Sequence, residues 1–374
     1  HLANDAVDAD ILADNSVGLA AMAHGTDGNL ITFDASGAPA YVATGNDGQV
    51  LTSAGAGAAP VFETISTTDT LSFRNLIRNG AMNIHQRGGT ITATGYLIDG
   101  WAYNEDTDGT VEMSQATDGP AGFTKSLKLD VTGTDTSLAG GQNLHVYQNI
   151  EGRDCIGLAF GTSDAATVTL SFWVKSNKTG TYSIVLENSA GNRAYVQDYT
   201  ISSSNTWEKK TITVAGDTSG TWLTTTGIGM RVRFGQCGGS SHTTGTTGSW
   251  LAGDMVGSTN MVNLMDSTSN DWYLSGVQLE VGSTATDYEY VPYSYELLRS
   301  QRYYLNLDMF YSACMTYTPG SGDHTFTRMN CTFPTTMRAN PSGVAGAFAC
   351  WSWSSASSTS TTTWSFDNGP NNAM

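Results

Sequence analysis

The chain has 374 residues, enough for more than one domain, and 42 of them are glycine while only 14% are charged. Its 34 acidic residues outnumber its 17 basic ones, for a formal net charge of -17 at pH 7. A field of that sign repels nucleic acid and anionic membranes, so we expect neither as a direct partner. Neutral sugars, or anionic sugars bridged by divalent cations, remain compatible with it. Glycine-rich, uncharged polar sequence favours an all-β protein with many turns.

Five cysteines are present, an odd number with no closely spaced pair: Cys155, Cys237, Cys314, Cys331 and Cys350. A disulfide framework or a zinc site has even counts or tight pairs, so we expect reduced thiols. No apolar run approaches the ~20 residues that span a bilayer, and no secretory signal is visible. The chain begins at His1 rather than Met, and we expect further sequence upstream.

Residues 1–24 carry an apolar side chain about every five positions, at Leu2, Val7, Leu12, Val17 and Met22. Neither a helix, with a period of 3.6, nor a strand, with a period of 2, produces that spacing. So short a repeat cannot bury a core alone and needs stacked neighbours or other copies of the chain. We predict an intertwined stalk here.

Residues 25–66 form tandem Gly-Asp-Gly units, since Gly25–Thr32 returns as Gly45–Thr52. Asp-Gly and Ser-Gly steps supply the positive φ of tight turns, so each unit predicts a β-hairpin. Residues 67–76 are expected to be a polar linker.

Residues 77–292 predict a β-sandwich of jelly-roll type. Val168, Leu170, Phe172 and Val174 alternate with polar residues and with Trp173. Further alternating runs, separated by turn signals, are Thr181–Leu186, Lys210–Val214 and Val277–Val281. Gly235–Ser258 predicts a long loop of the kind that is often functional.

Residues 293–374 predict a short helix followed by a small C-terminal β domain. The helical stretch is Tyr295–Tyr303, which follows Pro292. Alternation returns around Trp351–Trp353 and Thr361–Phe366.

Several segments in a fixed order now point to a family: Asn75–Gly88, Leu170–Ser176, Asn205–Glu208, Leu274–Gly282, Ala285–Tyr290, Gln301–Tyr304 and Phe333–Pro341. The chain resembles bacteriophage tail-fibre proteins that carry such a sandwich domain after Gly-Asp-Gly repeats. The resemblance implies a virion appendage, usually a homotrimer, assembled in the host cytoplasm. Its implied partners are other tail or baseplate proteins and host cell-surface polysaccharide. Nothing here resembles a tube-binding amino-terminal domain, so tail, baseplate and head all stay open as attachment points.

Sugar rings pack their C–H faces on tryptophan and tyrosine, so exposed tryptophans are the first candidates for binding. We predict ligand contacts from Trp222, Trp250, Trp351, Trp353 and Trp364. Trp173 and Trp207 lie in strong strand patterns, and we expect them to seal a core or a subunit contact.

No catalytic motif, cofactor site or metal site is predicted. Acidic residues gather around Trp101, at Asp99, Glu105, Asp106 and Asp108, and read as a solvated loop rather than a Ca²⁺ site. The scattered histidines are expected to be structural.

The function predicted from these features is a structural phage fibre, not an enzyme, that mediates host adsorption by multivalent glycan binding. The alternative is a purely structural appendage or connector that positions another receptor-binding protein. A binding module of a secreted enzyme explains the sandwich but not the stalk. A depolymerase needs two carboxylates, for which Asp254, Asp266 and Asp271 are the first suspects.

Overall fold

The computed structural model describes residues 27–36, 39–64, 73–306, 333–339, 349–351 and 358–360. The chain divides between Leu71 and Ser72 into two compact units. The predicted stalk, residues 1–24, lies outside the described residues. Within the described ranges, no helix is both long and apolar enough to cross a membrane.

Two antiparallel hairpins make up the described part of the first unit. Their strands are β1 (Leu30–Phe33), β2 (Pro39–Val42), β3 (Gln49–Thr52) and β4 (Val61–Thr64). The repeat is visible in the backbone, because Gly28 and Gly48 occupy equivalent positions with φ of 83° and 81°. An L side chain is strained at such angles, and glycine is not. Each tandem unit thus contains one antiparallel hairpin.

The hairpins bury almost nothing by themselves. Within residues 27–36 and 39–64, Val42 is the only buried apolar side chain. Large apolar side chains are exposed instead, namely Leu30, Ile31, Phe33, Tyr41, Val50, Leu51 and Val61. A two-stranded hairpin without a covered face is marginally stable in water, so these hairpins need a further surface to pack against.

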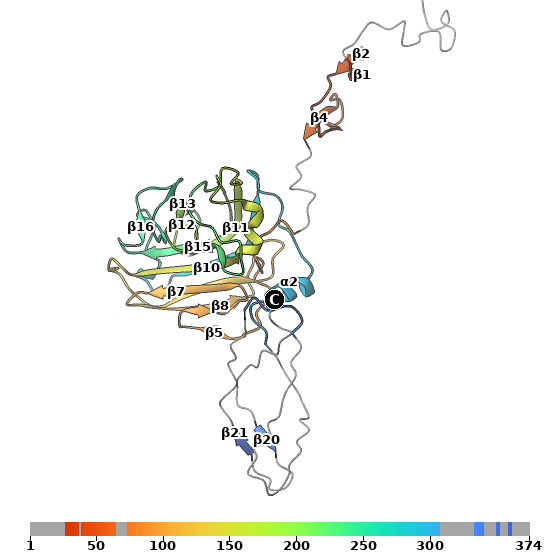
Figure 1. Cartoon of the computed structure of the whole chain (residues 1–374). Coiled ribbons are helices and arrows are strands. Elements are labelled where there is room, and N and C mark those ends of the chain that lie inside the picture. The colour runs from red at the N-terminus through yellow and green to blue at the C-terminus, as the bar shows by residue number, and fades with distance from the viewer. Residues whose placement is uncertain are drawn as a thin grey trace, which may run out of the picture. The chain divides into compact units, whose positions relative to one another are not determined.

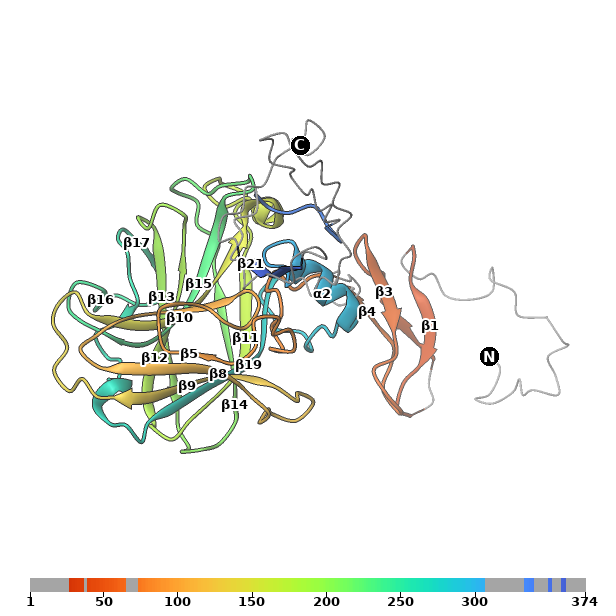
Figure 2. The same ribbon diagram turned by 90° about the horizontal axis from the view of Figure 1, so that it is seen from below.

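The second unit is a β-sandwich, as predicted (Figures 1 and 2). Within residues 73–306 one sheet has seven strands in the order β17-β13-β12-β15-β10-β7-β6, and the other has six in the order β14-β11-β19-β9-β8-β5. Neighbouring strands in both sheets are antiparallel. The seven-stranded sheet contains β6 (Gly95–Tyr96), β7 (Trp101–Asp106), β10 (Asn143–Glu151), β12 (Gly180–Glu187), β13 (Ala194–Ile201), β15 (Ile228–Gly238) and β17 (Trp250–Leu251). The six-stranded sheet contains β5 (Thr90–Ile91), β8 (Thr110–Ala116), β9 (Ser126–Gly133), β11 (Val168–Ser176), β14 (Glu208–Val214) and β19 (Asp271–Val281).

The core lies between the two sheets and follows the alternation of the sequence. Along β11, Val168, Leu170, Phe172 and Val174 are fully buried. Trp101 and Trp272 are the largest fully buried side chains. The same alternation places Trp173 on the outer face of the six-stranded sheet. Cys155 and Cys237 are free and buried, and burial raises the pKa of each thiol to about 12.

The segment predicted as one long loop, Gly235–Ser258, contains more structure than expected. Strand β15 continues to Gly238, and the short strands β16 (Thr243–Thr244), β17 and β18 (Gly257–Ser258) follow it. The backbone of this segment approaches itself closely, since a Cβ on Gly235 would lie 2.4 Å from the carbonyl oxygen of Val256. The glycines in this segment therefore serve packing as well as turns.

Helix α2 (Tyr293–Gln301) follows Pro292 and begins and ends two residues before the stretch expected from the sequence. Figure 1 shows it beside the sandwich. Just after it, Arg302 forms a bidentate ion pair with Glu151, with N–O distances of 2.7 and 2.9 Å. The main chain of Arg338 then donates to the carbonyl of Arg302. Two further short helices, of 3-10 type, are Gly152–Leu158 and Leu264–Asp266. Of the C-terminal β domain, the described part is one antiparallel pair, β20 (Ala349–Trp351) and β21 (Ser358–Ser360).

Candidate functional site

A hollow of about 370 Å³ opens on the outer face of the six-stranded sheet. We call it the aromatic pocket. Its lining combines residues from β11, β14 and β19 with two loop segments: Phe123, Ser171, Trp173, Lys209, Gly276, Asp287, Tyr288 and Tyr290. The volume lies at the lower end of the range found for small-molecule sites, ~300–1,000 Å³.

A β-bulge forms the floor of this pocket. The pairing of β11 with β19 shifts register between Ser171 and Trp173, and Gly276 lies in the bulge with a φ of 60°. A glycine in the left-handed region is typical of such a bulge, which bends the strand and re-aims neighbouring side chains. A Cβ at this position would lie 2.7 Å from the ring of Phe123 and 2.9 Å from that of Trp173. Glycine is therefore the residue that lets both rings approach the floor.

Three further aromatic rings stand together at the wall of the pocket. The centroid of Phe123 lies 4.9 Å from that of Tyr288 and 5.5 Å from that of Tyr290, and the two tyrosines are 4.9 Å apart. The two pairs that involve Tyr288 are edge-to-face, an arrangement that is favourable at these distances. The hydroxyl of Tyr290 donates to the carbonyl of Gly122 at 3.1 Å, while 61% of the residue stays exposed. The cluster is thus fixed at its base and open to solvent at its edge.

Polar groups of both signs complete the lining. Lys209 on β14 lies directly across from Trp173 in the ladder. Neither the ammonium of Lys209 nor the carboxylate of Asp287 has an ion-pair partner within the part of the chain that the structure describes. Both are exposed, so both can exchange water for a ligand's hydroxyl groups. The pocket therefore offers apolar ring surface with one cationic and one anionic group beside it.

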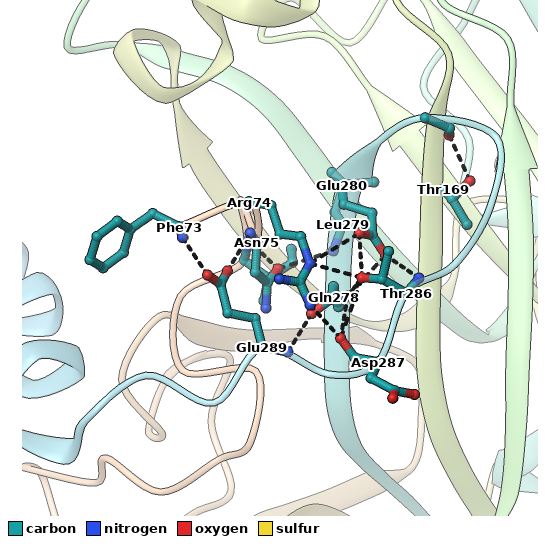
Figure 3. A network of polar contacts seen from close by, with 12 residues as sticks. Phe73, Arg74, Asn75, Thr169, Gln278, Leu279, Glu280, Thr286, Asp287 and Glu289 are labelled. Carbon is teal, nitrogen blue, oxygen red and sulfur yellow. Dashed lines mark hydrogen bonds and ion pairs between the residues drawn. The ribbon is translucent and has the colours of Figure 1, made fainter. Parts of the chain in front are cut away.

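A network of hydrogen bonds, which we call the clasp, holds the segment that carries Tyr288 and Tyr290 (Figure 3). The carboxylate of Glu289 accepts from the main-chain amides of Phe73 and Asn75. Its own amide donates to the side chain of Gln278 on β19 at 2.8 Å. Both the amide and the hydroxyl of Thr286 donate to the buried carboxylate of Glu280, at 3.0 and 2.7 Å.

The side chains of Asn75 and Arg74 complete the clasp. Asn75 bridges to the main chain of β19 at Val277 and Leu279. Arg74 donates to the hydroxyl of Thr286 at 2.8 Å and lies 3.4 Å from Glu280. Buried polar groups that are satisfied in this way fix a unique arrangement. The two tyrosines consequently have a defined position on the sheet.

The structure brings together two of the predicted tryptophans, away from the aromatic pocket. The rings of Trp222 and Trp250 are 5.4 Å apart, and both pack edge-on against Phe160. Their indole nitrogens donate to the carbonyls of Ser219 and Ala215. Both rings are half-buried against the sandwich core. Their predicted contact with sugar stays a prediction.

The other three predicted tryptophans yield no side-chain geometry. Trp351 is the last residue of β20, and its side chain lies outside the described residues, as do Trp353 and Trp364.

Trp173 and Trp207 both lie on the outer face of the six-stranded sheet and are partly exposed. Trp173 lines the aromatic pocket, while Trp207 lies beyond it and donates to Asp118 at 3.3 Å. Sequence reasoning overlooked Phe123, Tyr288 and Tyr290 as candidates. Tyr288 and Tyr290 are two residues apart, and in an extended chain this spacing places both side chains on the same side. That spacing is the signal in the sequence that could have identified them.

The acidic residues grouped in the sequence separate in the structure. Asp99 is buried and accepts two hydrogen bonds from Gln86, whereas Glu105 accepts from Thr107. Burial raises the pKa of Asp99. Within the described ranges, no group of three or more His, Cys, Asp or Glu side chains is arranged to hold a metal ion.

The three suspected catalytic carboxylates are engaged in the fold. Asp266 pairs with Lys178 at 2.7 Å, and Asp271 accepts from the hydroxyl of Tyr273 at 3.2 Å. Asp254 pairs with Arg233, which also lies 3.0 Å from the fully buried carboxylate of Glu187. Burial, opposed by Arg233, raises the pKa of Glu187 to about 7.

No family model matches the sequence. The search of curated proteins likewise finds no significant match. Similar solved structures include the enzymatically active domain of tailspike protein 4 from bacteriophage CBA120, at 16% identity over 56% of this chain and 22% of that chain, with a TM-score of 0.31. A putative sugar-binding protein from Bacteroides thetaiotaomicron is 14% identical over 56% of this chain and 100% of that one, with a TM-score of 0.32. A family 11 carbohydrate-binding module from Clostridium thermocellum, in complex with a mixed-linked tetrasaccharide, is 11% identical over 53% and 96%, with a TM-score of 0.28.

Proposed function

We propose that the sandwich binds glycans at the aromatic pocket. The observation that carries this proposal is the open hollow walled by Trp173, Phe123 and the two tyrosines, with Lys209 and Asp287 at its side. A pyranose has apolar C–H faces and a rim of hydroxyls, so it needs ring surface and a few polar groups together. The clasp and the bulge fix these groups before a ligand arrives, which lowers the entropic cost of binding.

We further propose that the chain is a homotrimeric fibre of a bacteriophage virion that attaches to host cell-surface polysaccharide. Support comes from the coreless repeats, from the exposed apolar hairpins and from the order of the family-like segments. A single shallow sugar site is weak, with a Kd of the order of 1 mM, equivalent to about -4 kcal/mol. Joining copies raises avidity by ~10²–10⁴ where the sites can be engaged together. Three copies on one fibre turn weak contacts into stable adsorption.

The test uses the full chain on an array of bacterial surface polysaccharides, followed by titration of each polysaccharide that binds. Trp173→Ala removes one wall of the pocket and is expected to weaken binding about tenfold or more, since a stacked ring is worth roughly 0.5–1.5 kcal/mol beyond the area it buries. Trp207→Ala is the matched control, because this ring is partly exposed on the same face but does not line the pocket.

Three outcomes have different meanings. Loss of binding in Trp173→Ala with retention in Trp207→Ala supports the proposal. Loss in Trp222→Ala or Trp250→Ala, but not in Trp173→Ala, moves the site to the other aromatic cluster. Failure to bind any polysaccharide favours the alternative, a connector that positions another receptor-binding protein.

A further inference from the structure

A second, smaller hollow lies next to the aromatic pocket and shares Tyr288 and Tyr290 with it. Its volume is about 70 Å³, and its remaining lining includes Asn83, Tyr293 and Glu296. Because two tyrosines belong to both linings, the hollows lie on either side of one aromatic partition. On the basis of the proposed function, we infer that the ligand is a chain of two or more linked sugars that crosses Tyr290, not a single terminal sugar.

Tyr290 has the properties that such a crossing requires. Its hydroxyl is anchored to the carbonyl of Gly122, and Phe123 packs near it at an interplanar angle of 32°. The residue is nevertheless 61% exposed. An anchored ring that remains exposed offers contact area to a ligand without a further loss of side-chain freedom.

The smaller hollow offers free polar groups. Within the described part of the chain, neither the amide of Asn83 nor the hydroxyl of Tyr293 has a hydrogen-bond partner, and both residues are exposed. Glu296, in contrast, is buried, accepts from the amide of Asn79 at 2.6 Å and pairs with Arg299. The available donors and acceptors are therefore those of Asn83 and Tyr293.

The size of the smaller hollow limits what enters it. At about 70 Å³ it is several times smaller than the ~300–1,000 Å³ of small-molecule sites. A whole sugar ring does not fit, but a hydroxymethyl group or a similar small polar substituent does. The second sugar then lies over Tyr290 and Tyr293, with its substituent against Asn83.

The experiment measures how affinity depends on ligand length. The probes are fragments of one, two, three and four sugars prepared from a polysaccharide that the full chain binds on the array. Calorimetric titration is expected to show at least fivefold tighter binding of the disaccharide than of the monosaccharide. Tyr293→Ala and Asn83→Ala should remove that gain and leave the affinity for the monosaccharide unchanged.

Matched variants separate the two hollows. Tyr290→Ala should weaken binding of all fragments, and Trp173→Ala should do the same. Tyr295→Ala is the control on the same helix, since its ring packs 4.8 Å from that of Phe73 and lines neither hollow. It should bind every fragment as the unaltered chain does.

Several results overturn the inference. Equal affinity for one and two sugars overturns it while the proposed function stands. An unchanged length dependence in Tyr293→Ala has the same meaning. If Tyr290→Ala and Tyr293→Ala instead reduce the sedimentation coefficient of the full chain, the surface is a contact between copies. Absence of binding to any polysaccharide overturns the proposed function, and the inference with it.

Discussion

Gly276 is the residue on which the shape of the aromatic pocket depends. Its φ of 60° and the short distances that a Cβ would make to Phe123 and Trp173 leave room for hydrogen only. Two costs combine on substitution, namely backbone strain and displacement of two rings.

Gly276→Ala is therefore expected to destabilise the sandwich by about 1–3 kcal/mol and to abolish glycan binding. Urea unfolding, followed by tryptophan fluorescence, measures the loss of stability. Titration with a polysaccharide that the unaltered chain binds measures the loss of binding. Gly141→Ala is the control, because a Cβ there meets no atom within 4 Å. An unaltered pocket affinity in Gly276→Ala would contradict the role given to the bulge.

Glu187 makes the stability of the sandwich depend on pH. Its carboxylate is fully buried, and it faces Arg231 at 2.7 Å, Arg233 at 3.0 Å and the carboxylate of Asp254. Burial raises its pKa from an ordinary 4.5 to about 7 despite the two guanidinium groups. The folded state therefore holds a proton that the unfolded state releases between these two values.

Glu187 therefore makes the free energy of unfolding fall as pH rises from about 4.5 to about 7. Above that range it no longer changes the free energy of unfolding with pH. Glu187→Gln should flatten the profile in this window, as measured by urea unfolding at a series of pH values. Glu208→Gln is the control. Burial tends to raise the pKa of Glu208, but hydrogen bonds from Lys210 and the Ser203 and Ser202 amides lower it overall. The stabilising contribution of Glu208 is therefore lost only as pH falls below about 4.5. A slope that persists in Glu187→Gln would contradict the assignment.

At the scale of elements, the segment Thr286–Tyr290 owes its position to β19. Gln278 is fully buried, and its amide nitrogen donates to the hydroxyl of Thr286 at 3.1 Å and to the carbonyl of Asp287 at 3.3 Å. Its side-chain oxygen accepts from the amide of Glu289 at 2.8 Å. It touches no ligand, so it is a positioning residue.

Gln278→Ala should cost about 1–3 kcal/mol, because buried polar partners are left unsatisfied. Binding of a polysaccharide should weaken with it, since Tyr288 and Tyr290 lose their support, while the monosaccharide contacts of Trp173 remain. Gln142→Ala is the comparison, since this glutamine accepts from the amide of Ala139, away from the pocket. Equal binding by both variants would rule out a positioning role for Gln278.

The sequence predicts the elements of this fold better than the site they form. Alternation along β11 predicts the buried face and places Trp173 opposite to it, because one strand contains the whole pattern. The pocket instead joins Phe123 to Tyr288 and Tyr290, which are far apart in the chain, so no local pattern contains it. A weaker signal exists at the bulge, where Leu274 and Val277 are both buried but three residues apart, not two. That irregularity marks the position of Gly276.

At the scale of the whole molecule, the exposed apolar side chains of the hairpins predict self-association. Phe33 is 66% exposed and Tyr41 is 52% exposed in strands with no covering layer of their own among the described residues. The trimer proposed above predicts that the full chain sediments as three copies. Phe33→Ser should shift it towards monomer, whereas Ile156→Ser, at a 57% exposed position of the sandwich, should not. A monomeric full chain at micromolar concentration would contradict the prediction.

The clasp also has a mechanical consequence. It fastens the main chain at Phe73 and Asn75 to Glu289, so the segment that enters the sandwich and the segment that leads to helix α2 are joined at one point. A pull between these two segments loads the hydrogen bonds of the clasp before it reaches the strands of the sheets. The sandwich therefore keeps its shape under such a pull until the hydrogen bonds of the clasp break.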